Sequence, residues 1–231
     1  MDQDNSIRLN KYLALKRGIS RREADDMIAR GDVTLDGRTV ELGARVLPDS
    51  QVSLHGQPLG QEATELIYIA LDKPVGYVCS RRQQGSSPTI YELLPPKYQP
   101  LKAVGRLDRD SSGLILLSND GDFAFRMTHP KFMKTKVYEL TLDRELEPLH
   151  QQMIADYGVS LDDGVSKLGL ARLSGDDRRT WQVTMSEGRN RQIRRTFASL
   201  GYTVETLRRT QFGGYSLHDI KNNEPTLVDM R

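Results

Sequence analysis

Cysteine and histidine are scarce in this chain, which holds one cysteine and four histidines among 231 residues. A single thiol, Cys79, excludes an internal disulfide and fits a reducing compartment. The histidines and the cysteine show neither Cys-x-x-Cys nor His-x-x-x-His spacing, so the pattern of a zinc site is missing. We therefore expect a protein that works without a metal.

Long apolar runs are also missing. The longest, 66–71, is far too short to span a bilayer. The first residues, Met1 to Ser6, are polar and acidic and lack the apolar core of a signal peptide. A content of 37% hydrophobic and 28% charged residues is typical of an ordinary soluble protein. These features predict a cytoplasmic location and no membrane role.

Acidic residues are absent between Arg8 and Arg22, so the small net charge of +2 hides a basic face. A charge run of this kind often marks only a solvated helix surface. The cations of the run are Arg8, Lys11, Lys16, Arg17, Arg21 and Arg22.

Helix signals within this basic run favour a binding role. Ser20 and Glu23 fit a capping box at the start of a helix that should end at Gly31. Arg21 and Arg22 then occupy its first turn, where cations oppose the helix macrodipole. Their presence there indicates an external anion, such as a phosphate backbone, that compensates for the cost.

A tight hairpin follows, because residues 33–40 alternate around an Asp36-Gly37 turn, and a short strand is predicted at 52–54. The order of two helices and a hairpin resembles the small alpha-L (S4-like) RNA-binding module. The resemblance implies structured RNA as a partner and covers residues 1–60, with a polar linker up to residue 65. It also implies that four cations contact the RNA: Arg8, Lys11, Arg21 and Arg22.

The remaining part, residues 66–231, has the pattern of an α+β domain. Strands are predicted at 67–71, at 77–80 after a Pro-Gly turn, and at 114–117, 136–142 and 180–185. Helices are predicted at 145–155 and between Gly188 and Gly201. Because the strands do not alternate with helices, we expect a mixed, mainly antiparallel sheet.

Asp108 stands between Arg106 and Arg109 in the run Gly105 to Gly113, directly before the apolar segment 114–117. An ionised carboxylate beside a reactive carbon serves as a nucleophile. Two other interpretations fit less well. An EF-hand loop starting at Asp108 would need an acid where Asn119 stands. A turn-capping aspartate would be the default in an arginine-rich loop, but the segments described next argue against that role here.

The same run resembles the Gly-Arg-Leu-Asp signature of the RNA pseudouridine synthases, and three further segments resemble that family in the same order. The closest resemblance is to the Rsu/Rlu-type ribosomal RNA enzymes with an N-terminal alpha-L domain. It implies an isomerase that uses no cofactor. The three segments are Lys73 to Gly76, Lys136 to Leu140 and Glu187 to Arg195.

The resemblance also implies roles for single residues. Asp108 would be the catalytic carboxylate, Arg194 the basic residue that pairs with it, and Tyr138 the tyrosine that stacks on the target base. Arg106 would fill the stack that the flipped uridine leaves, or hold its phosphate. From periodicity alone, Tyr138 could equally be a strand residue half in the core.

Helix geometry separates Arg194 from Arg195 by about 100°, so we expect Arg194 to point at Asp108 and Arg195 to face solvent or RNA. The other arginines of this C-terminal stretch would contact phosphates without reading sequence. These predicted phosphate contacts are Arg189, Arg191, Arg195, Arg208 and Arg209.

The predicted partner is ribosomal RNA, and the chain is expected to act as a monomer. The segments 8–12 and 190–195 are closer to the large-subunit enzymes, with a small-subunit substrate as the alternative. A non-catalytic RNA-binding factor for ribosome assembly is the second alternative. The joint presence of Asp108, Tyr138 and Arg194 favours the enzyme.

Overall fold

The computed structural model describes residues 6–60, 64–221 and 224–231. The chain divides into two compact units, Met1–Leu66 and Ile67–Arg231. The first five residues and positions 61–63 of the predicted linker lie outside the described ranges. Within those ranges, no helix is long and apolar enough to cross a membrane.

Two helices and short strands build the first unit. Its core is formed by Leu9 and Leu13 from α1, Ala24 and Ile28 from α2, and residues of the strands. The strands β3-β2-β5-β6 form a sheet and β1 pairs with β4. The elements are β1 (Ile7–Arg8), α1 (Leu9–Arg17), α2 (Arg21–Ala29), β2 (Val33–Leu35), β3 (Arg38–Thr39), β4 (Arg45–Val46), β5 (Val52–Leu54) and β6 (Gln57–Pro58).

The local predictions for this unit are confirmed. The side chain of Ser20 accepts a hydrogen bond from the backbone nitrogen of Glu23, and the side chain of Glu23 accepts one in return. Asp36 and Gly37 both have positive φ, 51° and 77°, as the two-residue turn between β2 and β3 requires.

The second unit contains most of the chain and all of the elements from β7 onward. In chain order these are β7 (Tyr68–Lys73), η1 (Ile90–Leu93), η2 (Pro96–Tyr98), β8 (Lys102–Val104), β9 (Ser112–Ser118), α3 (Gly121–Thr128), η3 (Pro130–Phe132), β10 (Lys136–Leu142), α4 (Pro148–Gln152), the π-helix η4 (Met153–Tyr157), β11 (Val159–Leu161), β12 (Gly164–Ser166), β13 (Gly169–Arg172), β14 (Thr180–Met185), α5 (Gln192–Ala198), β15 (Val204–Phe212), β16 (Tyr215–Ser216), η5 (Leu217–Asp219) and β17 (Thr226–Leu227).

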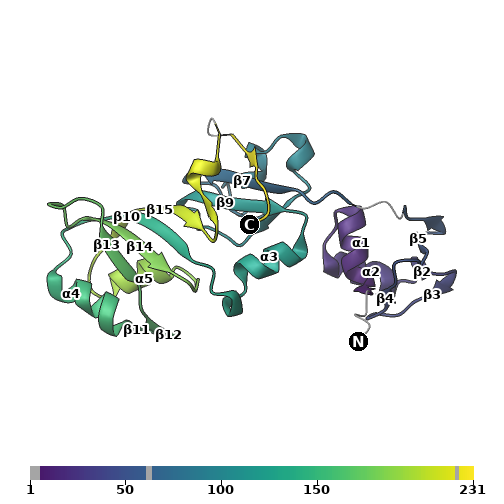
Figure 1. Ribbon diagram of the computed structural model, residues 1–231, viewed down its shortest axis with the longest axis horizontal. Coiled ribbons are helices and arrows are strands. Elements are labelled where there is room, and N and C mark those ends of the chain that lie inside the picture. Colours follow the sequence, from purple (N-terminus) through teal and green to yellow (C-terminus); the bar gives the residue numbers. More distant parts are fainter. Residues whose placement is uncertain (1–5, 61–63, 222–223) are drawn as a thin grey trace. The chain divides into compact units, whose positions relative to one another are not determined.

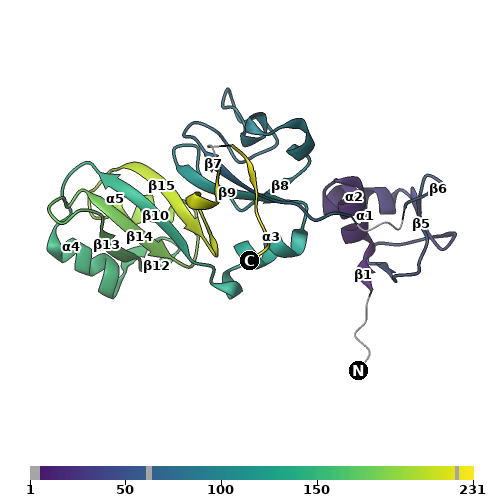
Figure 2. The same cartoon turned by 45° about the horizontal axis from the view of Figure 1, so that its top comes forward.

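Within the described residues, a nine-stranded mixed sheet organises the second unit (Figures 1 and 2). Its path is β13-β14-β10-β15-β9-β7-β17, with β16 beside β15 and β8 beside β9. The pairings along this path are antiparallel except that of β15 with β9, which is parallel and joins Arg208 to Ser112 and Arg209 to Gly113. The predicted α+β class with a mainly antiparallel sheet is confirmed.

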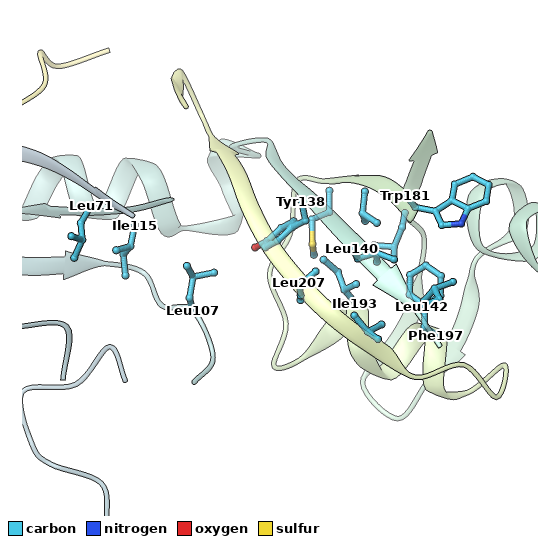
Figure 3. Packing of buried hydrophobic residues seen from close by; sticks show 14 of the residues in the cluster. Leu71, Leu107, Ile115, Tyr138, Leu140, Leu142, Trp181, Ile193, Phe197 and Leu207 are labelled. Atoms are coloured by element: carbon cyan, nitrogen blue, oxygen red, sulfur yellow. The ribbon is translucent and has the colours of Figure 1, made fainter. Parts of the chain in front are cut away.

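One large hydrophobic cluster extends under both halves of the sheet. Figure 3 shows Leu71 and Ile115 on the β7–β9 side and Leu140, Leu142 and Trp181 on the β10–β14 side. The apolar run before Asn119 is therefore a buried strand, as predicted: the side chains of residues 114–117 are at most 1% exposed.

Two predicted elements differ from the structure. Residues 77–80 form no strand beyond an isolated bridge between Val78 and Thr89. The backbone nitrogen of Val78 donates to Pro88 and its carbonyl oxygen accepts from Ile90, so its hydrogen bonds go to the segment 88–90 and not to a strand. The helix predicted at 145–155 begins later, at Pro148, and continues as a π-helix to Tyr157. Leu146 is fully buried before it, and proline favours the first helical position.

Candidate active site

The loop between β8 and β9 carries Asp108, whose side chain is 36% exposed. The loop is fixed from two sides. Leu107 is buried, the backbone nitrogen of Ser111 donates to the carbonyl oxygen of Asp108 (3.1 Å), and that of Gly76 donates to the carbonyl oxygen of Arg109 (2.7 Å). The carboxylate is therefore presented at the surface from a rigid support.

A fully buried lysine supports the same loop from inside. The Nζ of Lys73 donates to the carbonyl oxygen of Ser111 at 2.6 Å. Burial lowers the pKa of Lys73, while Cys79 and the carboxylates of Asp108 and Asp110 act in the opposite direction. The lysine of the segment Lys73 to Gly76 thus holds the loop rather than facing the outside.

Arg191 forms an ion pair with Asp108, with 3.5 Å between its Nη1 and the Oδ2 of the aspartate. The same guanidinium grips Asp110 with two hydrogen bonds of 2.9 Å each. This grip is the main reason why the pKa of Asp110 is lowered. The carboxylate of Asp110 thus orients Arg191 toward the carboxylate of Asp108.

The prediction that Arg194 points at Asp108 is wrong in its choice of arginine. Arg194 donates to the backbone oxygens of Asp110 (2.8 Å) and Val204 (2.5 Å), and its Nε lies 3.3 Å from the carboxylate of Asp110. The reason is local: α5 begins only at Gln192, and Arg191 precedes it with a positive φ of 45°. The spacing of side chains in a helix therefore does not apply to Arg191.

Arg195 and Arg189 were predicted to contact phosphates, but both are occupied within the fold. Arg195 donates to both oxygens of Asp163, at 3.1 and 2.6 Å. Arg189 donates to Asp163 at 2.8 Å and to backbone oxygens of Gly164 and Val165. These two arginines fasten the turn between β11 and β12, and the side chain of Arg195 remains 30% exposed to solvent, as predicted.

Tyr138 lies on β10 and is 8% exposed. It belongs to the large hydrophobic cluster and also lines a cleft with Asp108. Figure 3 shows its hydroxyl end directed to the side where Leu107 lies and away from Trp181. Tyr138 is therefore a buried residue of the core that also contributes to the lining of the cleft, and its stacking on a base stays a prediction.

The cleft has a volume of about 410 Å³ and lies within the second unit. The loop residues Gly105 to Asp108 form part of its lining, and Tyr138, Met185 and Leu207 add an apolar part. Arg106, which is exposed, also lines the cleft. The size and mixed lining of the cleft suit a small ligand with polar and apolar parts.

Two further cations in the cleft were not singled out as part of it from the sequence. Lys136 donates to the backbone oxygen of Glu187 (3.1 Å). Arg209 is 2% exposed and donates through Nε to the backbone oxygen of Leu114 (2.8 Å), so it is a buried residue rather than a surface phosphate contact. Arg208, another predicted phosphate contact, is paired with Asp72 at 2.5 Å and has a side chain that is 41% exposed.

The remaining predicted RNA contacts lie in the first unit. Arg8, Arg21 and Arg22 are exposed and Lys11 is partly exposed. Arg21 donates to the side chain of Asn10 (3.1 Å) and so links α2 to α1. These four cations belong to a different compact unit from the cleft.

Comparison with known families decides the class of the protein. A model of the family RNA pseudouridylate synthase matches residues 67–199, more than half of the chain, and an S4 domain matches residues 7–52. The chain belongs to the RNA pseudouridylate synthase family. It is therefore an RNA isomerase, as the sequence predicted.

Relatives within the RNA pseudouridylate synthase family match over almost the whole chain. The chain is 36% identical to a ribosomal small subunit pseudouridine synthase A of Yersinia pestis, covering 92% of this chain and 90% of the relative. It is 32% identical to a ribosomal large subunit pseudouridine synthase B of Bacillus subtilis (strain 168), covering 94% and 90%. A solved pseudouridylate synthase is 30% identical, covers 96% of both chains and superposes with a TM-score of 0.66.

Proposed function

We propose that the chain converts one specific uridine of ribosomal RNA to pseudouridine, with Asp108 as the carboxylate nucleophile. The observation that carries this proposal is the cleft itself. It places a partly exposed carboxylate, with an arginine nitrogen at 3.5 Å, in one lining with the ring of Tyr138. A carboxylate, a cation and an aromatic ring are the groups that a cofactor-free rearrangement of a nucleotide needs.

The reaction is an isomerisation, so no atom is gained or lost by the uridine overall. The bond between the base nitrogen and the ribose breaks, the base turns, and a base carbon joins the ribose. That carbon loses its proton, and the freed nitrogen gains one. As the bond between base and ribose breaks, the Asp108 carboxylate forms a bond to the ribose or to the base, and that bond breaks again when the base carbon joins the ribose. Tyr138 stacks on the base and exchanges the proton.

The target base must leave its stack to reach Asp108, at a cost of about a few kcal/mol. Arg106, exposed at the cleft, is positioned to fill the vacated stack or to hold the phosphate of the flipped nucleotide. The cations Arg8, Lys11, Arg21 and Arg22 of the first unit supply phosphate contacts that orient the RNA. We leave Arg189 and Arg195 out of these contacts because Asp163 occupies them.

For the substrate we propose large-subunit ribosomal RNA, on the resemblance of segments 8–12 and 190–195. Small-subunit RNA is the second candidate, because the relative from Yersinia pestis, at 36% identity, is named for the small subunit. A relative named for the large subunit has 32% identity over a similar share of the chain.

The test is pseudouridine mapping in ribosomal RNA from cells with and without the gene, followed by restoration with the purified protein. We expect one uridine of large-subunit RNA to depend on the protein. Asp108→Asn should abolish the modification and leave RNA affinity within a few-fold, whereas Asp156→Asn, at an exposed aspartate of η4, should be fully active. A modified site in small-subunit RNA would establish the second candidate, and an active Asp108→Asn would overturn the assigned nucleophile.

A further inference from the structure

The last turn of α3 and the turn that joins α3 to β10 expose aromatic side chains to solvent. Phe125 is 45% exposed, Phe132 36% and the neighbouring Met133 67%. Figures 1 and 2 show this turn projecting from the second unit between α3 and β10. Exposed aromatic rings gathered at one place are typical of a ligand-binding or interaction surface.

The rings contact one another in a defined arrangement. The ring of Phe125 lies 4.7 Å from that of His129 and 5.6 Å from that of Phe132, measured between centroids. Phe125 and Phe132 are nearly perpendicular, at 88°. A flat ligand stacked on one of these rings would therefore meet the other at its edge. We refer to Phe125, His129, Lys131 and Phe132 as the aromatic turn.

Backbone hydrogen bonds fix the aromatic turn before any ligand arrives. The backbone nitrogen of Phe132 donates to the carbonyl oxygen of His129 (3.1 Å), and that of Met133 to the carbonyl oxygen of Pro130 (3.0 Å). Met133 takes a left-handed conformation with φ 44°. A turn that is already ordered loses little entropy when it binds, which favours affinity.

The surroundings of the aromatic turn are basic. No aspartate or glutamate occurs in residues 125–136, which contain Arg126, Lys131, Lys134 and Lys136. The Nζ of Lys131 lies 5.1 Å from the ring centre of Phe125 and 4.7 Å from that of Phe132. Exposed aromatic rings can stack on the base of a nucleotide, and a cation at the rings can pair with its phosphate.

The aromatic turn is continuous with the catalytic cleft. Thr128 and Pro130, on either side of His129, are both part of the cleft lining. A strand of RNA that delivers a nucleotide to Asp108 therefore passes close to the turn.

We propose that the aromatic turn binds an unpaired base of the RNA substrate, next to the target uridine in the chain. The base stacks on Phe125 or Phe132 while Lys131 pairs with its phosphate. This site rests on the proposed function for its substrate, and it adds a single-strand contact outside the groups that take part in the reaction. It reads no sequence, because every base has a face that stacks.

The test uses the full-length chain and single-stranded RNA of mixed sequence with one fluorescent 2-aminopurine. Phe125→Ala and Phe132→Ala should each weaken binding about tenfold and reduce the quenching that stacking causes. Phe132→Leu should weaken it similarly, since leucine keeps the apolar contact but removes the ring. Leu149→Ala, at a 62% exposed leucine of α4, is the matched control and should bind as the wild type does.

Lys131→Ala should lower the slope of log affinity against log salt by about one unit, whereas the phenylalanine variants should leave the slope unchanged. Unchanged affinity of both phenylalanine variants would overturn the proposal. Full binding by Phe132→Leu where Phe132→Ala loses affinity would show that the ring is not needed and would overturn it too, as would an equal loss with duplex RNA, whose bases are already stacked. Pseudouridine formation by the wild type is measured separately, so failure of the proposed function and failure of the aromatic turn are told apart.

Discussion

The side chain of Asp110 organises the charged groups around Asp108. It accepts two hydrogen bonds from Arg191, and its carboxylate also lies 3.3 Å from the Nε of Arg194. Two guanidinium groups against one carboxylate leave positive charge beside Asp108. Asp110 is in this sense a positioning residue, because it acts on the nucleophile only through Arg191.

Arg191→Lys should slow the reaction although the charge is kept. An ammonium cannot hold Asp110 at two points and reach Asp108 at the same time. Loss of a charge-assisted hydrogen bond predicts a decrease in the single-turnover rate of about tenfold to a hundredfold. Arg195→Lys is the matched control, because Arg195 grips Asp163 in the same two-point manner but away from Asp108. Equal rates for the two variants would contradict the assignment of Arg191.

Asp110→Asn should destabilise the fold in a manner that depends on pH. The pKa of Asp110 is lowered in the folded state, chiefly by Arg191. A lowered pKa means that the pair contributes stability above the usual range of a carboxyl group, and this contribution is lost as the pH falls through the lowered value. Urea unfolding should therefore show a larger difference between variant and wild type at neutral pH than in acid. A difference that is the same at both pH values would show that the charge of Asp110 is not responsible.

The sequence predicted an arginine of the 189–195 segment beside Asp108 but not the right one. The resemblance identified Arg194, and helical spacing then separated it from Arg195. The helix starts at Gln192, and the backbone turns at Arg191 with a positive φ, which no pattern of residue types indicates. The role of Asp163 was missed for a similar reason: it contacts Arg189 and Arg195 only after β11 and β12 pair.

At the scale of elements, the parallel pairing of β9 with β15 joins the two halves of the sheet. Gly113 lies in this pairing with φ 103°, and its partner is Arg209. A Cβ at Gly113 would lie 2.6 Å from the backbone nitrogen of Arg209 and closer still to its carbonyl oxygen. The last glycine of the Asp108 motif therefore permits close contact between two strands, immediately after the catalytic loop.

Gly113→Ala should be strongly destabilising, by about 3 kcal/mol or more, because it adds a backbone clash to an unfavourable φ. Gly85→Ala is the control: Gly85 also has a positive φ, 61°, but a Cβ there would meet nothing within 4 Å. It should cost only about 1 kcal/mol. Chemical denaturation of both variants measures the difference, and similar losses of unfolding free energy would show that β9 and β15 are not tightly packed at Gly113.

Elements with a strong local pattern could be predicted from the sequence, and their long-range pairing could not. The alternation in 136–142 and 180–185 gives the bounds of β10 and β14 as the structure has them. The parallel pairing of β15 with β9 joins residues that are far apart in the chain, and its register depends on the glycine contact described above. The segment 77–80 has the residues of a strand but pairs only through the isolated bridge between Val78 and Thr89.

At the scale of the whole molecule, each unit has its own hydrophobic core. The cluster around Leu13 and Ile28 lies entirely within the first unit, and the clusters around Ile115 and Phe123 lie within the second. A unit with its own core folds without its neighbour. We therefore expect the S4 domain and the synthase domain to be separable in an experiment.

Removal of residues 1–66 should leave a folded second unit that binds RNA more weakly and with less dependence on salt. The cations lost with the first unit include Arg8, Lys11, Arg21 and Arg22, and each phosphate contact contributes about one unit to the slope of log affinity against log salt. The slope should therefore fall by up to about four units, while circular dichroism still shows a cooperative melting transition.

In the intact chain, Arg21→Gln combined with Arg22→Gln should lower the slope by up to about two units without unfolding the domain. Both side chains are exposed, and the capping box that starts α2 depends on Ser20 and Glu23 instead. A truncated chain with the full salt slope would show that the basic face of the first unit does not contact RNA. The phosphate contacts would then have to come from the cations of the second unit, among them Arg106 and Lys131, and removal of each contacting cation would lower the slope by about one unit.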